Sequence, residues 1–171
     1  MAILANAALA ADPGAFRVAR EERLQDAEGS KSRPGAVALD LGNWRTLVDV
    51  TIASPFAAGG QVSTISAGFP AAAAATAYDR KVSKWRALLS DHQLDEENKS
   101  VSFQPIAITA MGAYDERSLL WLKKFSDICA SAKGIDKGLA FSDLMEKISV
   151  ALWRGNSRLL RVLRTVSDAE A

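Results

Sequence analysis

The sequence has very few of the residues that build disulfide frameworks and metal centres. It contains one cysteine and one histidine, which excludes an intrachain disulfide, a cysteine-ligated zinc site and a multi-histidine metal centre. We expect Cys129 to be a small core residue within an apolar helix, and His92 to be solvated in a polar segment. This cysteine usage predicts a reducing, intracellular compartment, with the nucleus as one candidate.

The sequence also lacks an excess of charge of either sign. Lys and Arg number 21 against 20 Asp and Glu, so the formal net charge is +1. Binding to nucleic acid through a global positive charge is therefore excluded, and any such contact needs a local basic patch. A glycine-rich phosphate loop is missing too, because Gly59 and Gly60 are not followed by the Gly-Lys-Ser/Thr of that motif.

Long hydrophobic runs are absent as well. No run approaches the roughly 18 apolar residues of a membrane-spanning helix, so we expect no membrane partner. Residues 1–11 are apolar but have no Lys or Arg before them, which favours a first helical turn over a signal peptide. What is present is apolar content: 49% of the 171 residues, enough for a buried core in a chain of single-domain length.

Local patterns predict an α/β or α+β domain with a small mixed sheet, in which a β-hairpin is flanked by helices. The strands are expected over residues 36–41 and 44–53, joined by a Gly42–Asn43 turn, and over residues 101–111, where Pro105 indicates an edge strand or a bulged one. Helices are expected over residues 16–27, about 71–90, 115–132 and 141–152, with a junction at Gly155 and Asn156 before a last helix.

We expect the domain to have three parts. Residues 1–32 form an N-terminal helix and linker, residues 33–133 form the core, and residues 134–171 form a helical extension packed on that core.

The hairpin turn sets a strand register that draws attention to Asp49. With a two-residue turn, Asp40 faces Arg45 and Ala36 faces Asp49. Two acids at the second pair would share one divalent cation, but only Asp49 is acidic. A carboxylate within an apolar strand is rarely buried unless it is paired or metal-bound. The alternatives are that Asp49 faces solvent or pairs with a lysine.

Four segments carry a resemblance to a known family. They are residues 32–37 (SRPGAV), 47–55 (LVDVTIASP), 73–85 (AAATAYDRKVSKW) and 103–112 (FQPIAITAMG). Their order and spacing resemble the restriction-like endonuclease domains attached to reverse transcriptases in site-specific non-LTR retrotransposons and related open reading frames, which belong to the PD-(D/E)XK nucleases. That family has Arg-Pro-x-Asp, an Asp in an apolar strand, an alanine-rich helix with Lys-x-x-Lys-Tyr, and a Phe-x-Pro strand. The resemblance covers roughly residues 33–132.

The resemblance implies Mg²⁺-dependent hydrolysis of DNA phosphodiesters, with Asp49 as the metal ligand. Two acids of the family pattern are missing: the first falls on Ala36 and a frequent later Glu falls on Thr109. The domain is then a decayed or inactivated nuclease, or a further acid such as Glu21 or Glu22 completes the site.

Two lysines are candidates for the same site. Lys81 and Lys84 are three positions apart and share a helix face. The resemblance implies that one of them stabilises negative charge at the phosphate. The common alternative for such a pair is a solvated helix face.

Arginines are the candidates for nucleic-acid contacts. Arg154, Arg158 and Arg161 lie on one face of the last helix, and no acid occurs between residues 151 and 167. Arg33 is expected to contact phosphate beside the site. The alternative is an ordinary cationic amphipathic surface helix.

We therefore expect a DNA endonuclease-like domain. An alternative is a catalytically inactive module on the same fold that binds nucleic acid or protein. A third hypothesis is that the helical C-terminal half is an assembly surface and that the resemblance is accidental.

Overall fold

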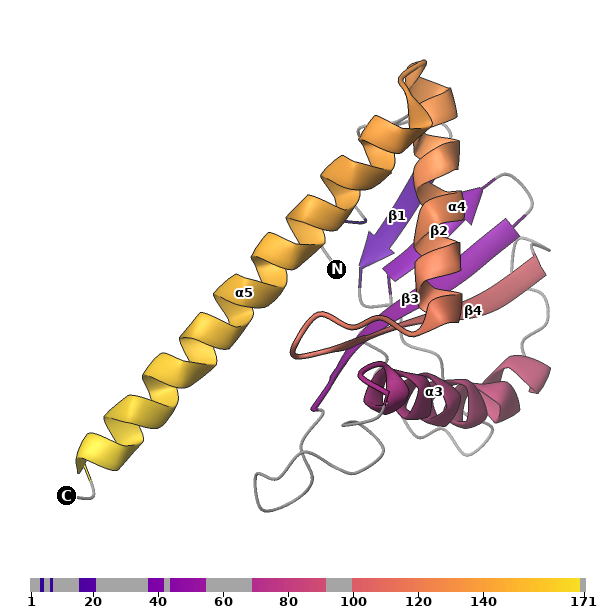
Figure 1. Cartoon of the computed structure of the whole chain (residues 1–171). Helices are drawn as coiled ribbons and strands as arrows, with labels where there is room; N and C mark the ends of the chain where they lie inside the picture. Colours follow the sequence, from indigo (N-terminus) through magenta and orange to yellow (C-terminus); the bar gives the residue numbers. More distant parts are fainter. Residues whose placement is uncertain are drawn as a thin grey trace.

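The computed structural model describes residues 4, 7, 16–20, 37–41, 44–54, 69–91 and 100–169. A four-stranded mixed sheet with helices packed on it forms the domain (Figure 1), which confirms the α/β prediction. The strands lie in the order β1 (Phe16–Arg20), β2 (Val37–Leu41), β3 (Trp44–Ala53) and β4 (Ser100–Thr109). The helices are α3 (Ala72–Asp91), α4 (Glu116–Lys133) and α5 (Lys137–Ala169).

The β2–β3 hairpin has the predicted register. The two strands are antiparallel, Leu41 pairs with Trp44, and Asp40 pairs with Arg45. β3 then pairs in parallel with β4, which places Asp49 beside Pro105. Since parallel strands need a crossover, α3 lies between them in the chain, as its alanine-rich sequence predicts.

The helix predicted over residues 16–27 is wrong for residues 16–20. These form β1, which pairs antiparallel with β2, so the sheet begins before residue 33. The sequence FRVAR has only a weak local preference, and its pairing with a neighbouring strand outweighs the helix propensity of single residues. Residues 21–27, including Glu21 and Glu22, lie outside the described part of the chain.

β4 is an edge strand, which is one of the two alternatives that Pro105 left open. Its outer side is bonded to the N-cap residue and the first turn of α4. The Ala107 N–H donates to Ser118 Oγ (2.9 Å), and the Ala107 carbonyl accepts from the Asp115 N–H (3.1 Å). Pro105 lies two positions before Ala107, so its backbone nitrogen is also on the side that faces away from β3. The missing N–H of proline therefore removes no hydrogen bond between β3 and β4.

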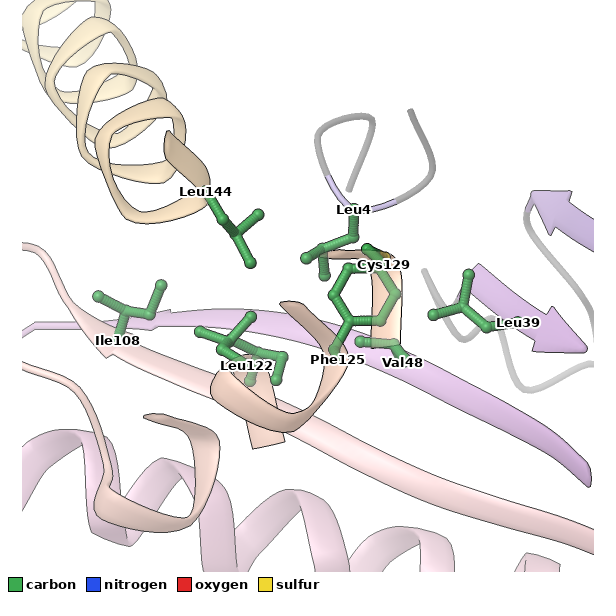
Figure 2. Close-up of a cluster of buried hydrophobic side chains, with 9 residues drawn as sticks. Leu4, Leu39, Val48, Ile108, Leu122, Phe125, Cys129 and Leu144 are labelled. Carbon is green, nitrogen blue, oxygen red and sulfur yellow. The ribbon is translucent and has the colours of Figure 1, made fainter. Parts of the chain in front are cut away.

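The two faces of the sheet pack against different helices. On one face, Leu39, Val48 and Ile108 form the main core with side chains of α4 and α5 (Figure 2). On the other face, α3 lies over β4 and β3, where Trp85 stacks on Phe103 with ring centroids 4.8 Å apart. Because side chains alternate along a strand, Asp49 lies on the α3 face.

α4 begins and ends where the sequence predicts. Asp115 is the N-cap, and its carboxylate accepts hydrogen bonds from the Arg117 and Ser118 N–H groups. Gly134 ends the helix with a φ of 66°, a left-handed conformation that glycine adopts at little cost.

The junction predicted at Gly155 and Asn156 is wrong, because α5 is one helix of 33 residues. Asn156 Nδ2 donates to the Ala110 carbonyl (2.8 Å), which ties this part of α5 to the turn after β4. A long-range hydrogen bond therefore stabilises the segment that local propensity would interrupt. None of the described helices combines the length and apolar content needed to cross a membrane.

Candidate functional site

The candidate site is an ion pair between β3 and α3. Lys81 Nζ lies 2.6 Å from Asp49 Oδ2, and the two residues come from elements that the parallel crossover brings together. Of the alternatives for Asp49, the structure therefore shows pairing with a lysine. Since Asp49 is only 5% exposed, its carboxylate depends on this ammonium for compensation.

The pair is asymmetric with respect to solvent. The Asp49 side chain is 7% exposed, whereas the Lys81 side chain is 27% exposed. Lys81 therefore follows the usual behaviour of a long cationic side chain, burying its stem against the sheet while its ammonium stays close to water. The ammonium side of the pair is therefore the more solvent-accessible side.

Lys84 does not join the pair. It is exposed, one helical turn after Lys81 on α3. Of the two lysines that the sequence offers, the structure selects Lys81 as the partner of Asp49. Lys84 is solvated instead, which is the alternative that the sequence allowed for Lys81 and Lys84 alike.

The described residues do not fit a magnesium site at Asp49. Nowhere in the described ranges do three His, Cys, Asp or Glu side chains gather closely enough to hold a metal ion. One oxygen of the single carboxylate already accepts a hydrogen bond from Lys81. The predicted pair of Ala36 and Asp49 lies one step beyond the last described pair, Val37 with Val48, and Ala36 itself lies outside the described residues.

Thr109 has a different role from a metal ligand. It lies beside Ala53, four residues along the strand from the level of Asp49 and Pro105, or roughly 13 Å away. It is fully buried, and its Oγ1 accepts a hydrogen bond from the Ala113 N–H (2.9 Å). Thr109 therefore closes the turn that follows β4, and an acid at this position would not share a cation with Asp49.

The predicted partnership of Asp40 and Arg45 is confirmed. Arg45 Nε lies 3.5 Å from Asp40 Oδ1 across the hairpin. The Asp40 side chain is 11% exposed and the Arg45 side chain is 18% exposed, so this cross-strand ion pair is largely buried. This ion pair accounts for the presence of an acid at position 40, so no catalytic role for Asp40 is needed.

Sequence reasoning missed a second charged cluster, which joins α3 to α4. The Arg117 guanidinium donates to Asp79 (2.7 Å) and Asp115 (3.0 Å) and lies 3.8 Å from the ring centroid of Tyr78. The hydrogen bond to Asp115 raises the pKa of Arg117 above its ordinary value. Because Asp115 is also the helix cap, the cluster fixes the start of α4 against α3. The sequence indicated only that a helix starts at about Asp115.

The candidate nucleic-acid contacts lie apart from this pair. Arg154, Arg158 and Arg161 are exposed on α5, which packs with α4 on the face of the sheet opposite α3. The C-terminal half of α5 extends past the sheet (Figure 1). The structure thus does not bring these arginines together with Asp49 and Lys81. Arg33 and His92 lie outside the described residues.

Cys129 is buried in the core, as its apolar surroundings predict. Burial raises the pKa of its thiol, while the positive charge of Lys133 acts in the opposite direction. A buried thiol with a raised pKa is a poor nucleophile, so Cys129 is not a catalytic candidate.

No protein-family model matches the chain, and no curated protein matches it.

Proposed function

We propose that this chain is a restriction-endonuclease-like domain that binds DNA and, as the sequence stands, does not cleave it. The observation that carries the proposal is the pair of Asp49 and Lys81, which stand 2.6 Å apart. They occupy the strand and helix positions at which the resemblance expects an acid and a lysine of a phosphodiester site.

The expected lack of cleavage follows from the shortage of acidic metal ligands around Asp49. Metal-dependent hydrolysis of a phosphodiester needs several anionic ligands to hold the cations that activate water and stabilise the leaving oxygen. Within the described residues Asp49 belongs to no group of three possible metal ligands, and its charge is already neutralised by Lys81. The ammonium remains as a point charge toward phosphate.

DNA binding is supported by the charge pattern of α5. Its residues 151–167 contain four arginines and no acid, and Arg154, Arg158 and Arg161 are exposed. A row of cations on a projecting helix suits the phosphates of a nucleic acid. The expected partner is therefore DNA, held through a local basic surface on a molecule of nearly neutral net charge.

The test uses the purified chain with supercoiled plasmid DNA and Mg²⁺ or Mn²⁺. We expect a salt-dependent mobility shift without nicking. The Ala36→Asp variant supplies the acid that the register places opposite Asp49, and we expect it to nick the plasmid and to bind Mn²⁺ in a calorimetric titration.

The controls separate this proposal from an active nuclease. Adding Asp49→Ala to the Ala36→Asp variant should abolish nicking, and circular dichroism checks that both variants fold. Nicking by the unaltered chain that Asp49→Ala removes would identify an active enzyme and contradict the proposal. Failure to bind DNA at low salt would contradict it as well.

A further inference from the structure

A second site, unrelated to the ion pair, lies between α4 and α5. It is an open cavity of about 340 Å³ close to the connection between the two helices. α4 contributes one wall and the first turns of α5 contribute the other. The lining includes Phe125, Ser126, Cys129 and Ala130 of α4 and Asp143 and Leu144 of α5.

The floor of the cavity is buried and mostly apolar. Phe125, Ala130 and Leu144 supply carbon surface, and Cys129 adds a polarizable sulfur. Ser126 is the polar exception: it is only 3% exposed, and it is one of the lining residues. A mainly apolar pocket with a few placed polar groups is typical of small-molecule sites.

The rim of the cavity is exposed and carries the charge. Lys147 Nζ is paired with Asp143 Oδ2 at 2.6 Å, so these two largely cancel. Among the described lining residues, Lys133 is the remaining cation, at the last residue of α4. Lys133 lines the cavity, and its positive charge opposes the burial-induced rise in the pKa of Cys129.

We propose that this cavity binds a small amphipathic monocarboxylate, whose apolar body rests on the floor and whose carboxylate pairs with Lys133. The sign of the head group follows from the rim, where one cation is left after Lys147 and Asp143 are paired. The size of the body follows from the volume. A cavity of about 150 Å³ holds a benzene molecule, so 340 Å³ accommodates a body of eight to twelve carbon atoms. The site is independent of the proposed DNA function.

The probe is octanoate, titrated into the full chain and followed by NMR chemical shifts or calorimetry. We expect saturable binding with a dissociation constant of about 1 mM or tighter, the range that ligand efficiencies give for ten non-hydrogen atoms. Acetate lacks the body and octylamine has the opposite charge, so each should bind at least tenfold more weakly. Octylamine binding as tightly as octanoate would overturn the proposal, as would the absence of saturation.

The matched variants are Lys133→Glu and Lys123→Glu. Both residues are exposed lysines of α4, but only Lys133 lines the cavity. We expect Lys133→Glu to weaken octanoate binding about tenfold and Lys123→Glu to leave it unchanged, and equal effects would contradict the assignment. Independently, saturating octanoate should slow the alkylation of Cys129 by iodoacetamide at least threefold in the unaltered chain. An unchanged rate would show that the ligand does not occupy this cavity.

Discussion

Asp49 is tolerated in an apolar strand because Lys81 compensates its charge. Removing a carboxylate from water has a large unfavourable desolvation free energy. The attraction of Asp49 to the Lys81 ammonium at 2.6 Å offsets much of it. The pair is therefore a condition for the fold whether or not it still serves a reaction. Its contribution to stability can be measured apart from any activity.

Lys81→Met should lower the free energy of unfolding by about 2 kcal/mol, below the 3–5 kcal/mol typical of fully buried pairs because Lys81 is partly exposed. The measurement is urea unfolding at neutral pH. The double variant Asp49→Asn with Lys81→Met removes both charges and should recover part of the loss. Lys84→Met, on the exposed position one turn away, is the control and should stay within about 0.5 kcal/mol of the parent.

Tyr114 gives a prediction at alkaline pH. Its hydroxyl is buried without a hydrogen-bond partner in the described structure, and burial raises the pKa of Tyr114 above 10.0. The unfolded chain therefore loses this proton at lower pH than the folded chain, so stability should fall as the pH rises past about 10. Tyr114→Phe should remove this part of the fall and raise the free energy of unfolding at pH 7 by about 1 kcal/mol. Parallel stability curves from pH 7 to 11 would contradict this assignment.

At the scale of helices and strands, the reliable signals were those with a local cause. The two-residue turn determined the hairpin register, Pro105 indicated an edge strand, and Asp115 and Gly134 bounded α4. The errors concern segments whose structure depends on distant partners. Residues 16–20 form a strand because they pair with β2. α5 continues through Gly155 because the side chain of Asn156 donates a hydrogen bond to the Ala110 carbonyl, which holds this part of the helix in place.

Two glycines should respond oppositely to alanine. In α5, nothing lies within 4 Å of a Cβ added at Gly155, so Gly155→Ala should raise the free energy of unfolding by about 1 kcal/mol through helix propensity. At Gly134 the φ of 66° disfavours any side chain, and Gly134→Ala should lower it by about 1 kcal/mol. Thermal unfolding of the two variants, side by side with the parent, checks both signs. A loss of stability in Gly155→Ala would mean that α5 is not helical at that position.

The candidate site was predictable only in part. Asp49 was visible as an acid in an apolar strand, and Lys81 was one of two lysines on the right helix face. Which lysine would pair with it depended on how α3 lies over β3, a tertiary contact that periodicity does not specify. The cluster around Arg117 and the cavity between α4 and α5 arise wholly from such contacts.

At the scale of the whole molecule, the charged features are distributed over two sides. Asp49 and Lys81 form their pair between β3 and α3, whereas the arginines lie on α5, which packs on the opposite face of the sheet. The predicted DNA contacts of α5 can therefore be altered without disturbing the ion pair.

Substituting Arg154 and Arg158 should weaken DNA binding through fewer phosphate contacts. Each phosphate contact contributes about 0.9 to the slope of log affinity against log salt. Arg154→Gln with Arg158→Gln should thus reduce the magnitude of the slope by nearly 2, measured by fluorescence anisotropy on a labelled duplex. Lys124→Gln, on an exposed position of α4, should leave the slope unchanged. A slope that both sets of variants leave intact would show that α5 does not contact DNA.

The unbroken course of α5 also determines how the molecule tolerates insertions. Its 33 residues make a rod of about 50 Å. Each residue of an α-helix adds about 100° of rotation and 1.5 Å of rise. A single residue inserted after Asn156 would therefore turn Arg158 and Arg161 about a quarter of the way around the axis, whereas seven inserted residues would restore nearly the original bearing. The first half of α5 is packed on the domain, so the number of residues between it and the arginines determines the direction in which the arginines face.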